Sequence, residues 1–219
     1  DADRFELQIL LALNRVGETG AVLRRLVDQA PAPARNDAIN AIPQIYARVT
    51  DKVAALQVVR EAMAPSLTQP AHSAAAWTTI GFMELAASQP AQALTSARNG
   101  HAAEAASPFP ALRAVELVER GQTAAEAVVK SQLKASPLAP GGATTVAMAY
   151  ARLLFDLQRP TDAQVLLEEL TRIQPDAMEP WLLLATLQVQ NKRLPAAIRS
   201  LQTYMGLARQ SNDERASRG

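Results

Sequence analysis

Apolar residues recur every three or four positions along almost the whole chain, and polar residues fill the positions between them. One such stripe comprises Leu153, Leu154 and Leu157, and a second runs from Val165 to Ile173. Residues three or four apart lie on one face of an α-helix, so each stripe predicts an amphipathic helix. The alternation of single apolar and polar residues that is typical of a half-buried strand is not evident. The pattern therefore predicts an all-α fold.

The helical pattern repeats at a fixed interval. The segment that begins at Ala147 aligns with the segment that begins at Trp181, 34 residues later. An alanine follows 16 residues after each of these starts, and the same spacing separates Trp77 from Ala93. A period near 34 residues that contains two helices is typical of a solenoid, in which stacked hairpins bury their apolar faces against one another.

Prolines mark where several helices begin. Pro90, Pro160 and Pro195 each lie two or three residues before the alanine that recurs in the second helix. Proline is tolerated in the first turn because the N–H group that it lacks would have no partner there. The spacing predicts a helical repeat array over residues 1–209 and, at 210–219, a polar tail or the start of a further helix. The expected hairpins span residues 3–30, 35–64, 72–104, 109–136, 143–174 and 178–209.

At these positions the chain resembles the tetratricopeptide repeat family. In that family a large residue, a small residue and an aromatic residue lie on the first helix of each hairpin, and a small residue lies near the start of the second. The matching residues include Trp77, Gly81 and Ala93 in the third hairpin, Tyr150, Ala151 and Ala163 in the fifth, and Trp181, Ala185, Ala197 and Tyr204 in the sixth. The resemblance implies a right-handed superhelical solenoid of about six antiparallel helix hairpins.

The alanine-rich and arginine-rich composition of the chain is also similar to that of long tetratricopeptide repeat proteins of the Gram-negative envelope. Because the chain begins at Asp1 and not at a methionine, we expect a processed chain or a section of a longer protein. The resemblance implies a bacterial protein that is periplasmic or associated with the envelope, with the cytoplasm as the alternative.

The composition argues against several classes of activity. The 22 basic and 21 acidic residues give a formal net charge of +1, which does not favour a nucleic-acid partner. The absence of cysteine excludes thiol catalysis, and the two histidines, His72 and His101, lack the spacing of metal ligands. No apolar run approaches the roughly 18 residues that a membrane span needs. We therefore expect no enzymatic activity, no cofactor, no metal site and no membrane span.

The candidate binding surface follows from the resemblance, because the first helix of each tetratricopeptide hairpin lines the inner face of the array. Residues four and three apart on these helices share that face. Phe82 and Phe155 are large apolar residues that the hairpin core does not need, so they either anchor a partner or pack on neighbouring hairpins. The candidate partner-binding residues are Asn40, Gln44, Arg48, Thr78, Phe82, Leu85, Glu116, Met148, Arg152, Phe155 and Thr186.

The hypothesis is a scaffold that binds a helix or peptide of a partner protein in this groove or at the ends of the array. A second copy of the chain is a further candidate for the ends. Two alternatives stay open, because a fold does not specify a function. One is a repeat domain of a longer chain that serves the assembly or regulation of an enzyme or envelope complex. The other is a groove for a small ligand or a glycan, although only 4% of the residues are aromatic.

Overall fold

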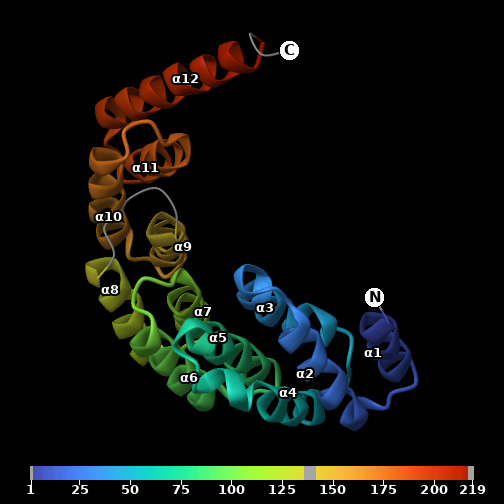
Figure 1. The fold of residues 1–219 in the computed structure, drawn as a ribbon. Coiled ribbons are helices and arrows are strands. Elements are labelled where there is room, and N and C mark those ends of the chain that lie inside the picture. Colours follow the sequence, from blue (N-terminus) through green and yellow to red (C-terminus); the bar gives the residue numbers. More distant parts are fainter. Residues whose placement is uncertain (1, 136–141, 217–219) are drawn as a thin grey trace. The chain divides into compact units, whose positions relative to one another are not determined.

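The computed structural model describes residues 2–135 and 142–216, together with the side chains in these ranges other than those of 143 and 212–216. Residues 1, 136–141 and 217–219, which the expected array and tail include, lie outside the described residues. The described chain contains twelve α-helices and no strand (Figure 1). The helices are α1 (Ala2–Ala12), α2 (Thr19–Gln29), α3 (Arg35–Ile45), α4 (Lys52–Leu67), α5 (Pro70–Ala86), α6 (Pro90–Ala103), α7 (Pro108–Glu119), α8 (Glu126–Ala135), α9 (Gly142–Asp156), α10 (Pro160–Ile173), α11 (Met178–Gln190) and α12 (Leu194–Ala216).

Two consecutive helices occupy each expected hairpin, and the all-α repeat fold is confirmed. Each expected hairpin contains one pair, from α1 with α2 to α11 with α12. Pro90 and Pro160 begin α6 and α10, and Pro195 is the second residue of α12. Short 3-10 helices at Val16–Glu18, Ala32–Ala34 and Thr123–Ala125 lead into α2, α3 and α8. Residues 210–216 continue α12, which is therefore the longest helix among those described.

The turn inside a hairpin also repeats. Ser88, Gln158 and Lys192 lie at equivalent positions between the two helices of their hairpins, and their φ angles are 60°, 58° and 58°. A backbone in this left-handed region reverses the chain directly after a helix, although side chains larger than glycine are strained there. One turn geometry thus recurs in the third, fifth and sixth hairpins.

Small residues let the two helices of a hairpin approach each other. Ala93, Ala163 and Ala197 are almost fully buried, at 0%, 0% and 2% exposure. A Cβ atom built on Gly81 in α5 would lie 3.3 Å from Cβ of Ser96 in α6. A larger side chain at any of these positions would force the helices apart, because protein interiors are close-packed.

The chain divides into two compact units, Asp1–Gln132 and Leu133–Gly219. The core of the first unit is a cluster that includes Ile39, Ile42, Tyr46, Leu56 and Met63, all nearly inaccessible to solvent. The second unit has its own buried residues, among them Leu154, Leu167 and Leu187.

Candidate functional site

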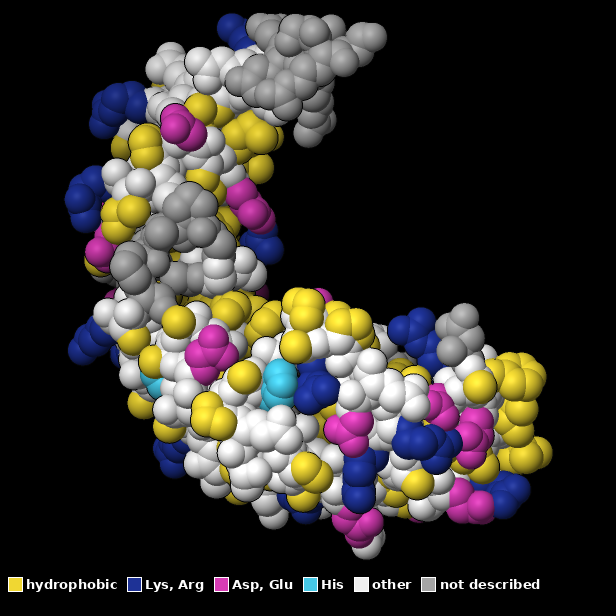
Figure 2. Space-filling view, in the orientation of Figure 1, with side chains coloured by type: hydrophobic (Ala, Val, Ile, Leu, Met, Phe, Trp, Pro, Cys, Tyr) yellow, Lys and Arg dark blue, Asp and Glu magenta, His cyan; other side chains and the backbone are white. Residues whose placement is uncertain are grey.

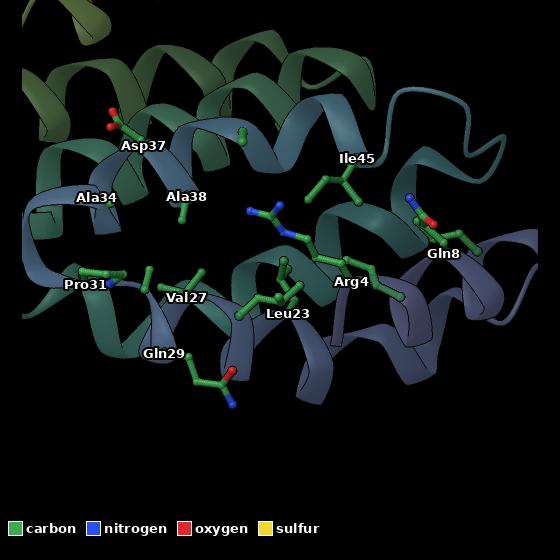
Figure 3. A pocket seen from close by; sticks show the side chains of 15 residues that line it. Arg4, Gln8, Leu23, Val27, Gln29, Pro31, Ala34, Asp37, Ala38 and Ile45 are labelled. Atoms are coloured by element: carbon green, nitrogen blue, oxygen red, sulfur yellow. The ribbon is translucent and has the colours of Figure 1, made fainter. Parts of the chain in front are cut away.

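An open trough lies in the first unit between α1 and α3, floored by α2 (Figure 3). Its volume is about 800 Å³. Most of its lining is aliphatic, and four of the lining side chains are polar or charged. The lining residues are Arg4, Leu7, Gln8, Leu11, Leu23, Leu26, Val27, Gln29, Ala30, Pro31, Ala34, Asp37, Ala38, Ala41 and Ile45.

Small side chains on α3 keep the trough open. Ala34, Ala38, Ala41 and Ile45 lie four, three and four positions apart, so they share the face of this segment that borders the trough. Three of these four side chains are methyl groups, which cannot reach across to α1. Within the described residues, α1 and α3 both pack on α2 but have little or no contact with each other. The next pair of first helices, α3 and α5, is closely packed.

Two charged residues border the trough without a partner. Arg4 and Asp37 make no ion pair or side-chain hydrogen bond with any part of the chain that the structure describes. In Figure 3 the side chain of Arg4 reaches into the trough, whereas that of Asp37 points away from it. The acidic residues of α1 that could pair with Arg4 are held by Arg25, at 2.9 Å from Asp3 and 2.6 Å from Glu6. The hydrogen bond to Asp3 raises the pKa of Arg25.

A second cluster lies between α5 and α7, the first helices of the third and fourth hairpins. The guanidinium carbon of Arg113 lies 4.4 Å from the centre of the Phe82 ring, a cation–π contact. Arg113 also forms an ion pair with Glu116, and Glu116 pairs with Arg120 at 3.2 Å. Burial, and secondarily the charge of Arg120, lowers the pKa of Arg113 to about 10. Phe82 and Glu116 thus belong to one site, through an arginine that the sequence analysis did not select.

The other candidates in the first unit differ in accessibility. Gln44 and Arg48 are exposed, and Asn40 is half-buried with an Oδ1 atom that has no hydrogen-bond partner in the described structure. Thr78 is buried and donates its hydroxyl to the carbonyl of Ala74 at 2.8 Å, and Leu85 is buried too. Phe82 is half-buried and packs on the core cluster as well as under Arg113. Direct contact with a partner is therefore open to Gln44, Arg48 and part of Phe82.

Two of the four candidates in the second unit, Met148 and Arg152, line shallow hollows of about 400 and 460 Å³. Met148 lines both hollows, although it is only 6% exposed. Arg152 of α9 forms an ion pair with Glu179 of α11 across the first hollow. Phe155 is half-buried, and exposed Thr186 donates its hydroxyl to the carbonyl of Leu182 at 2.9 Å.

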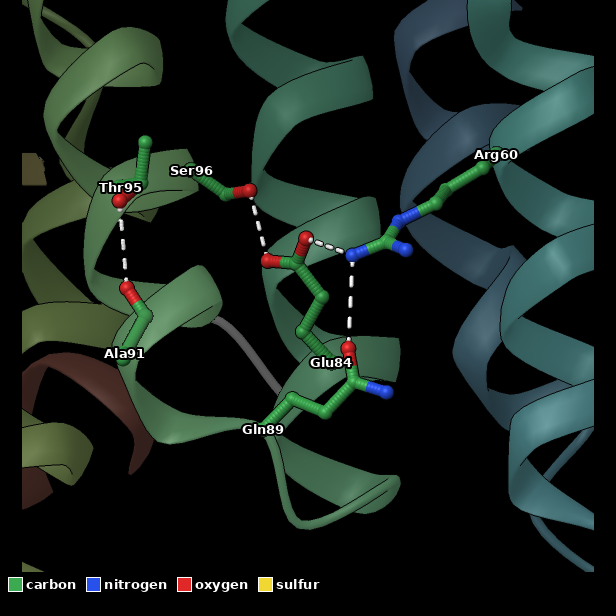
Figure 4. Close-up of polar contacts among 6 residues, drawn as sticks. All are labelled: Arg60, Glu84, Gln89, Ala91, Thr95 and Ser96. Carbon is green, nitrogen blue, oxygen red and sulfur yellow. Dashed lines mark hydrogen bonds and ion pairs between the residues drawn. The ribbon is translucent and has the colours of Figure 1, made fainter.

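A buried polar cluster in the first unit holds three helices together (Figure 4). Glu84 of α5 is only 4% exposed, and its carboxylate accepts hydrogen bonds from Arg60 of α4 and Ser96 of α6, both at 2.7 Å. The equivalent pair in the last hairpin is Gln188 with Ser200, at 2.9 Å. Because the same link recurs in two hairpins and both carboxylate oxygens are occupied, the cluster is best explained as a structural clamp.

Possible metal ligands are dispersed over the described residues. No group of three or more histidine, aspartate or glutamate side chains gathers there in a way that would hold a metal ion. His72 contacts the side chain of Asn36 at 2.8 Å, and His101 contacts Ser131 and Gln132. No helix in the described ranges combines the length and the apolar composition that crossing a bilayer requires.

The surface carries both signs of charge in close proximity. In the face shown in Figure 2, Lys and Arg side chains of the first unit lie beside Asp and Glu side chains, and hydrophobic side chains gather over α1. The exposed apolar residues of α1 and the turn after it are Phe5, Ile9 and Leu13.

Comparison with known proteins supports the fold. The tetratricopeptide repeat model matches residues 154–217. Among curated protein sequences, none matches the chain significantly. A crystal structure of MamA is similar with a TM-score of 0.56 at 8% identity, covering 80% of this chain and 97% of MamA. MamA 41-end from Desulfovibrio magneticus RS-1 has a TM-score of 0.51 at 12% identity, covering 80% and 96%.

The PilF protein of Pseudomonas aeruginosa is similar with a TM-score of 0.53 at 14% identity, covering 80% of this chain and 77% of PilF. Identities this low show a shared fold and nothing finer. They agree with the 34-residue recurrence, with the paired helices and with the match to the family model. The tetratricopeptide repeat model thus matches residues 154–217, and the described chain has the all-α fold of tetratricopeptide repeat solenoids.

Proposed function

We propose that the chain is a protein-interaction module that holds a segment of a partner protein in the trough between α1 and α3. The trough is the observation that carries this proposal. It is a preformed, mostly apolar hollow of about 800 Å³ that the chain itself leaves uncovered. Covering such a surface removes apolar area from water, which favours association at about 25 cal/mol per Å².

The proposed surface extends along the first helices of the hairpins in the first unit. Gln44, Arg48 and the accessible edge of Phe82 offer contacts there, and Thr78 and Leu85 support them from the core. Asn40 adds a buried acceptor without a partner in the described structure. The Arg113–Glu116 pair places two opposite charges beside Phe82, which suits a segment with mixed charge more than a polyanion. In the second unit the proposed surface comprises Met148, Arg152, Phe155 and Thr186.

The module acts by binding, without catalysis of its own and without nucleic acid as its partner. A role in the assembly or regulation of a larger bacterial complex, at the envelope or in the periplasm, agrees with this mode of action. A glycan-binding groove is less well supported, because no aromatic side chain lines the trough. Sugar rings usually stack on aromatic rings, and none is placed to receive them.

Selection from a random-peptide phage library tests the proposal. The wild-type protein is expected to enrich peptides that bind, and Ala41→Trp is expected to abolish their binding by filling the trough. Ala41 is exposed, so the tryptophan is accommodated without unfolding the protein. Ala91→Trp is the matched control, because Ala91 is exposed on α6 and does not line the trough. Peptides that bind wild type and Ala41→Trp equally, or a library that enriches none, would contradict the proposal.

A further inference from the structure

We infer that the trough takes an amphipathic helix of a partner protein, oriented by a carboxylate on that helix that pairs with Arg4. The inference rests on the proposed function and names the chemistry of its ligand. Three features carry it: the dimensions of the trough, the nature of its walls, and the charges at its border.

The trough has the dimensions of a helical guest. The wall on α3 runs from Ala34 to Ile45, which corresponds to about 17 Å, or three helical turns, at 1.5 Å per residue. Its other wall and its floor are also helices, α1 and α2. On one side α3 packs closely on α5. On its other side it has little or no contact with α1, the first helix of the preceding hairpin. A guest helix placed there would pack against α1, α2 and α3 together.

The apolar walls favour a helix over an extended peptide. Leu7, Leu11, Leu23, Val27 and the alanines of α3 offer no hydrogen-bond donors or acceptors from their side chains. An extended segment pressed against them would leave its backbone N–H and C=O groups without partners, which is costly when they are removed from water. A helix satisfies these groups internally and presents leucine-sized side chains at every third or fourth position.

Arg4 favours a negatively charged residue on the guest helix. Its side chain reaches into the trough and has no ion-pair partner among the described residues (Figure 3). The arginines of α2 and α3, by contrast, are engaged: Arg24 with the carbonyl of Glu61, Arg25 with Asp3 and Glu6, and Arg35 with the carbonyl of Asp28. A carboxylate beside the apolar stripe of the guest would supply Arg4 with an ion-pair partner.

A second copy of this chain fits these charges poorly. Its α12 has an exposed apolar stripe of suitable spacing, formed by Leu194, Ile198, Leu201 and Met205. Between Leu194 and Ser211, however, α12 contains Arg199 and Arg209 and no acidic residue. Inserting the stripe from Leu194 to Met205 would bring Arg199 towards Arg4 without a carboxylate beside it, because the acidic residues of α12 are Asp213 and Glu214 near its C-terminal end.

Fluorescence anisotropy with designed helical peptides tests the inference. The acidic probe is a capped, labelled peptide of about four helical turns, with leucines at every third or fourth position and a glutamate flanking the leucine stripe. The basic probe carries lysine in place of glutamate, and a third probe keeps the glutamate but replaces leucine by alanine. We expect wild type to bind the acidic probe about twofold to fivefold more tightly than the basic one, the range for one exposed ion pair. The alanine probe is expected not to bind.

Charge reversal supplies the decisive comparison. Arg4→Glu is expected to invert the preference, so that the basic probe binds more tightly than the acidic one. Arg98→Glu is the matched control, because Arg98 is an exposed arginine of α6 in the same unit that does not line the trough, and it should leave the preference unchanged. Ala41→Trp should abolish the binding of both leucine probes. Circular dichroism of the variants and of the bound probe checks that the protein is folded and that the probe is helical.

The possible failures are distinguishable. Equal binding of both leucine probes, or a preference that Arg4→Glu leaves unchanged, overturns the inference while the trough remains a protein-binding site. Failure of both leucine probes to bind wild type also overturns it, and the phage selection then decides the proposed function independently. Sedimentation of the protein alone tests whether the trough instead binds α12 of a second copy of the chain. A dimer that both Ile198→Asp and Ala41→Trp dissociate would identify the guest as α12 of a second copy, which would overturn the inference of a partner protein.

Discussion

Helices α1, α3 and α5 are the first helices of three successive hairpins. Helix α3 packs closely on α5, whereas it has little or no contact with α1. Ile39 and Ile42 of α3 are fully buried in the core cluster with residues of α5 such as Ile80 and Met83. The hydroxyl of Thr79 in α5 donates to the carbonyl of Ile39 at 2.9 Å. Asn36 adds a contact to His72 at 2.8 Å.

Towards α1, by contrast, α3 presents alanines, and the two helices have little or no contact with each other. No hydrogen bond of the described residues joins α1 to α3. Two faces of one helix therefore have different roles. The face with large residues contributes to the stability of the solenoid, and the face with small residues leaves a surface for a partner.

Truncation of a large side chain is expected to separate these roles most clearly. Ile39→Ala creates a cavity at a position that is 0% exposed, so we expect a loss of about 2–4 kcal/mol in the free energy of unfolding. Leu11→Ala removes a half-buried side chain of the trough and should cost about 1 kcal/mol. Urea titration followed by circular dichroism measures both values. Equal losses would mean that the trough is as much a part of the core as the α3–α5 contact.

Enlarging a small side chain provides the converse experiment. Ala93→Leu overpacks the contact between α5 and α6, where Ala93 is 0% exposed, and should destabilise by about 1–3 kcal/mol. Ala41→Leu projects into the trough and should change stability by less than about 0.5 kcal/mol, as for an exposed site. Thermal melting of the two variants beside wild type gives the comparison. A large loss for Ala41→Leu would show that the trough is filled in solution.

The smallest expected effect concerns the end of α3, where Tyr46 anchors the helix to the first hairpin. Its hydroxyl lies 2.7 Å from Oγ1 of Thr19, and Tyr46→Phe should cost about 1 kcal/mol at neutral pH by removing this hydrogen bond. Burial raises the pKa of Tyr46 above its ordinary value of 10.0.

The folded state therefore keeps the Tyr46 proton at pH values where the unfolded chain releases it. The resulting stabilisation is fully present below pH 10 and is lost as the pH rises through the folded pKa. Denaturant titrations at neutral and alkaline pH should show that Tyr46→Phe is less sensitive to alkali than wild type. An identical alkaline loss in both proteins would assign that loss to other groups.

The recurrence of residues 34 positions apart was sufficient to predict the hairpins, because stacking places equivalent residues in equivalent surroundings. Ala163 and Ala197 are buried where that recurrence placed them, and Pro90 and Pro160 begin the helices that were expected to start there. The inner-face residues were projected from the family pattern, and their role in binding stays a prediction. The burial of Thr78 and Leu85 shows that equal spacing along a helix does not guarantee equal exposure.

The trough was not predicted, although a signal for it was present. Ala34, Ala38 and Ala41 form a stripe of small residues at helical spacing, but an equivalent small residue, Ala93, lies in a tight helix–helix contact. Spacing and size alone do not distinguish these cases. Arg113 was missed for a related reason, since its stacking on Phe82 joins residues of two hairpins that no local pattern connects.

The local structure of this protein follows from its amino-acid sequence alone: where helices begin, how they pair, and which small residues let them approach. These features depend on periodicity, on proline geometry and on side-chain volume, which are properties of short segments. Which faces of those helices are covered was settled by tertiary packing. Whether α3 packs on α1 or stands apart from it depends on how all three neighbouring helices fill space together, and close packing is a property of the assembled chain. The open face at Arg4 is the result of that assembly.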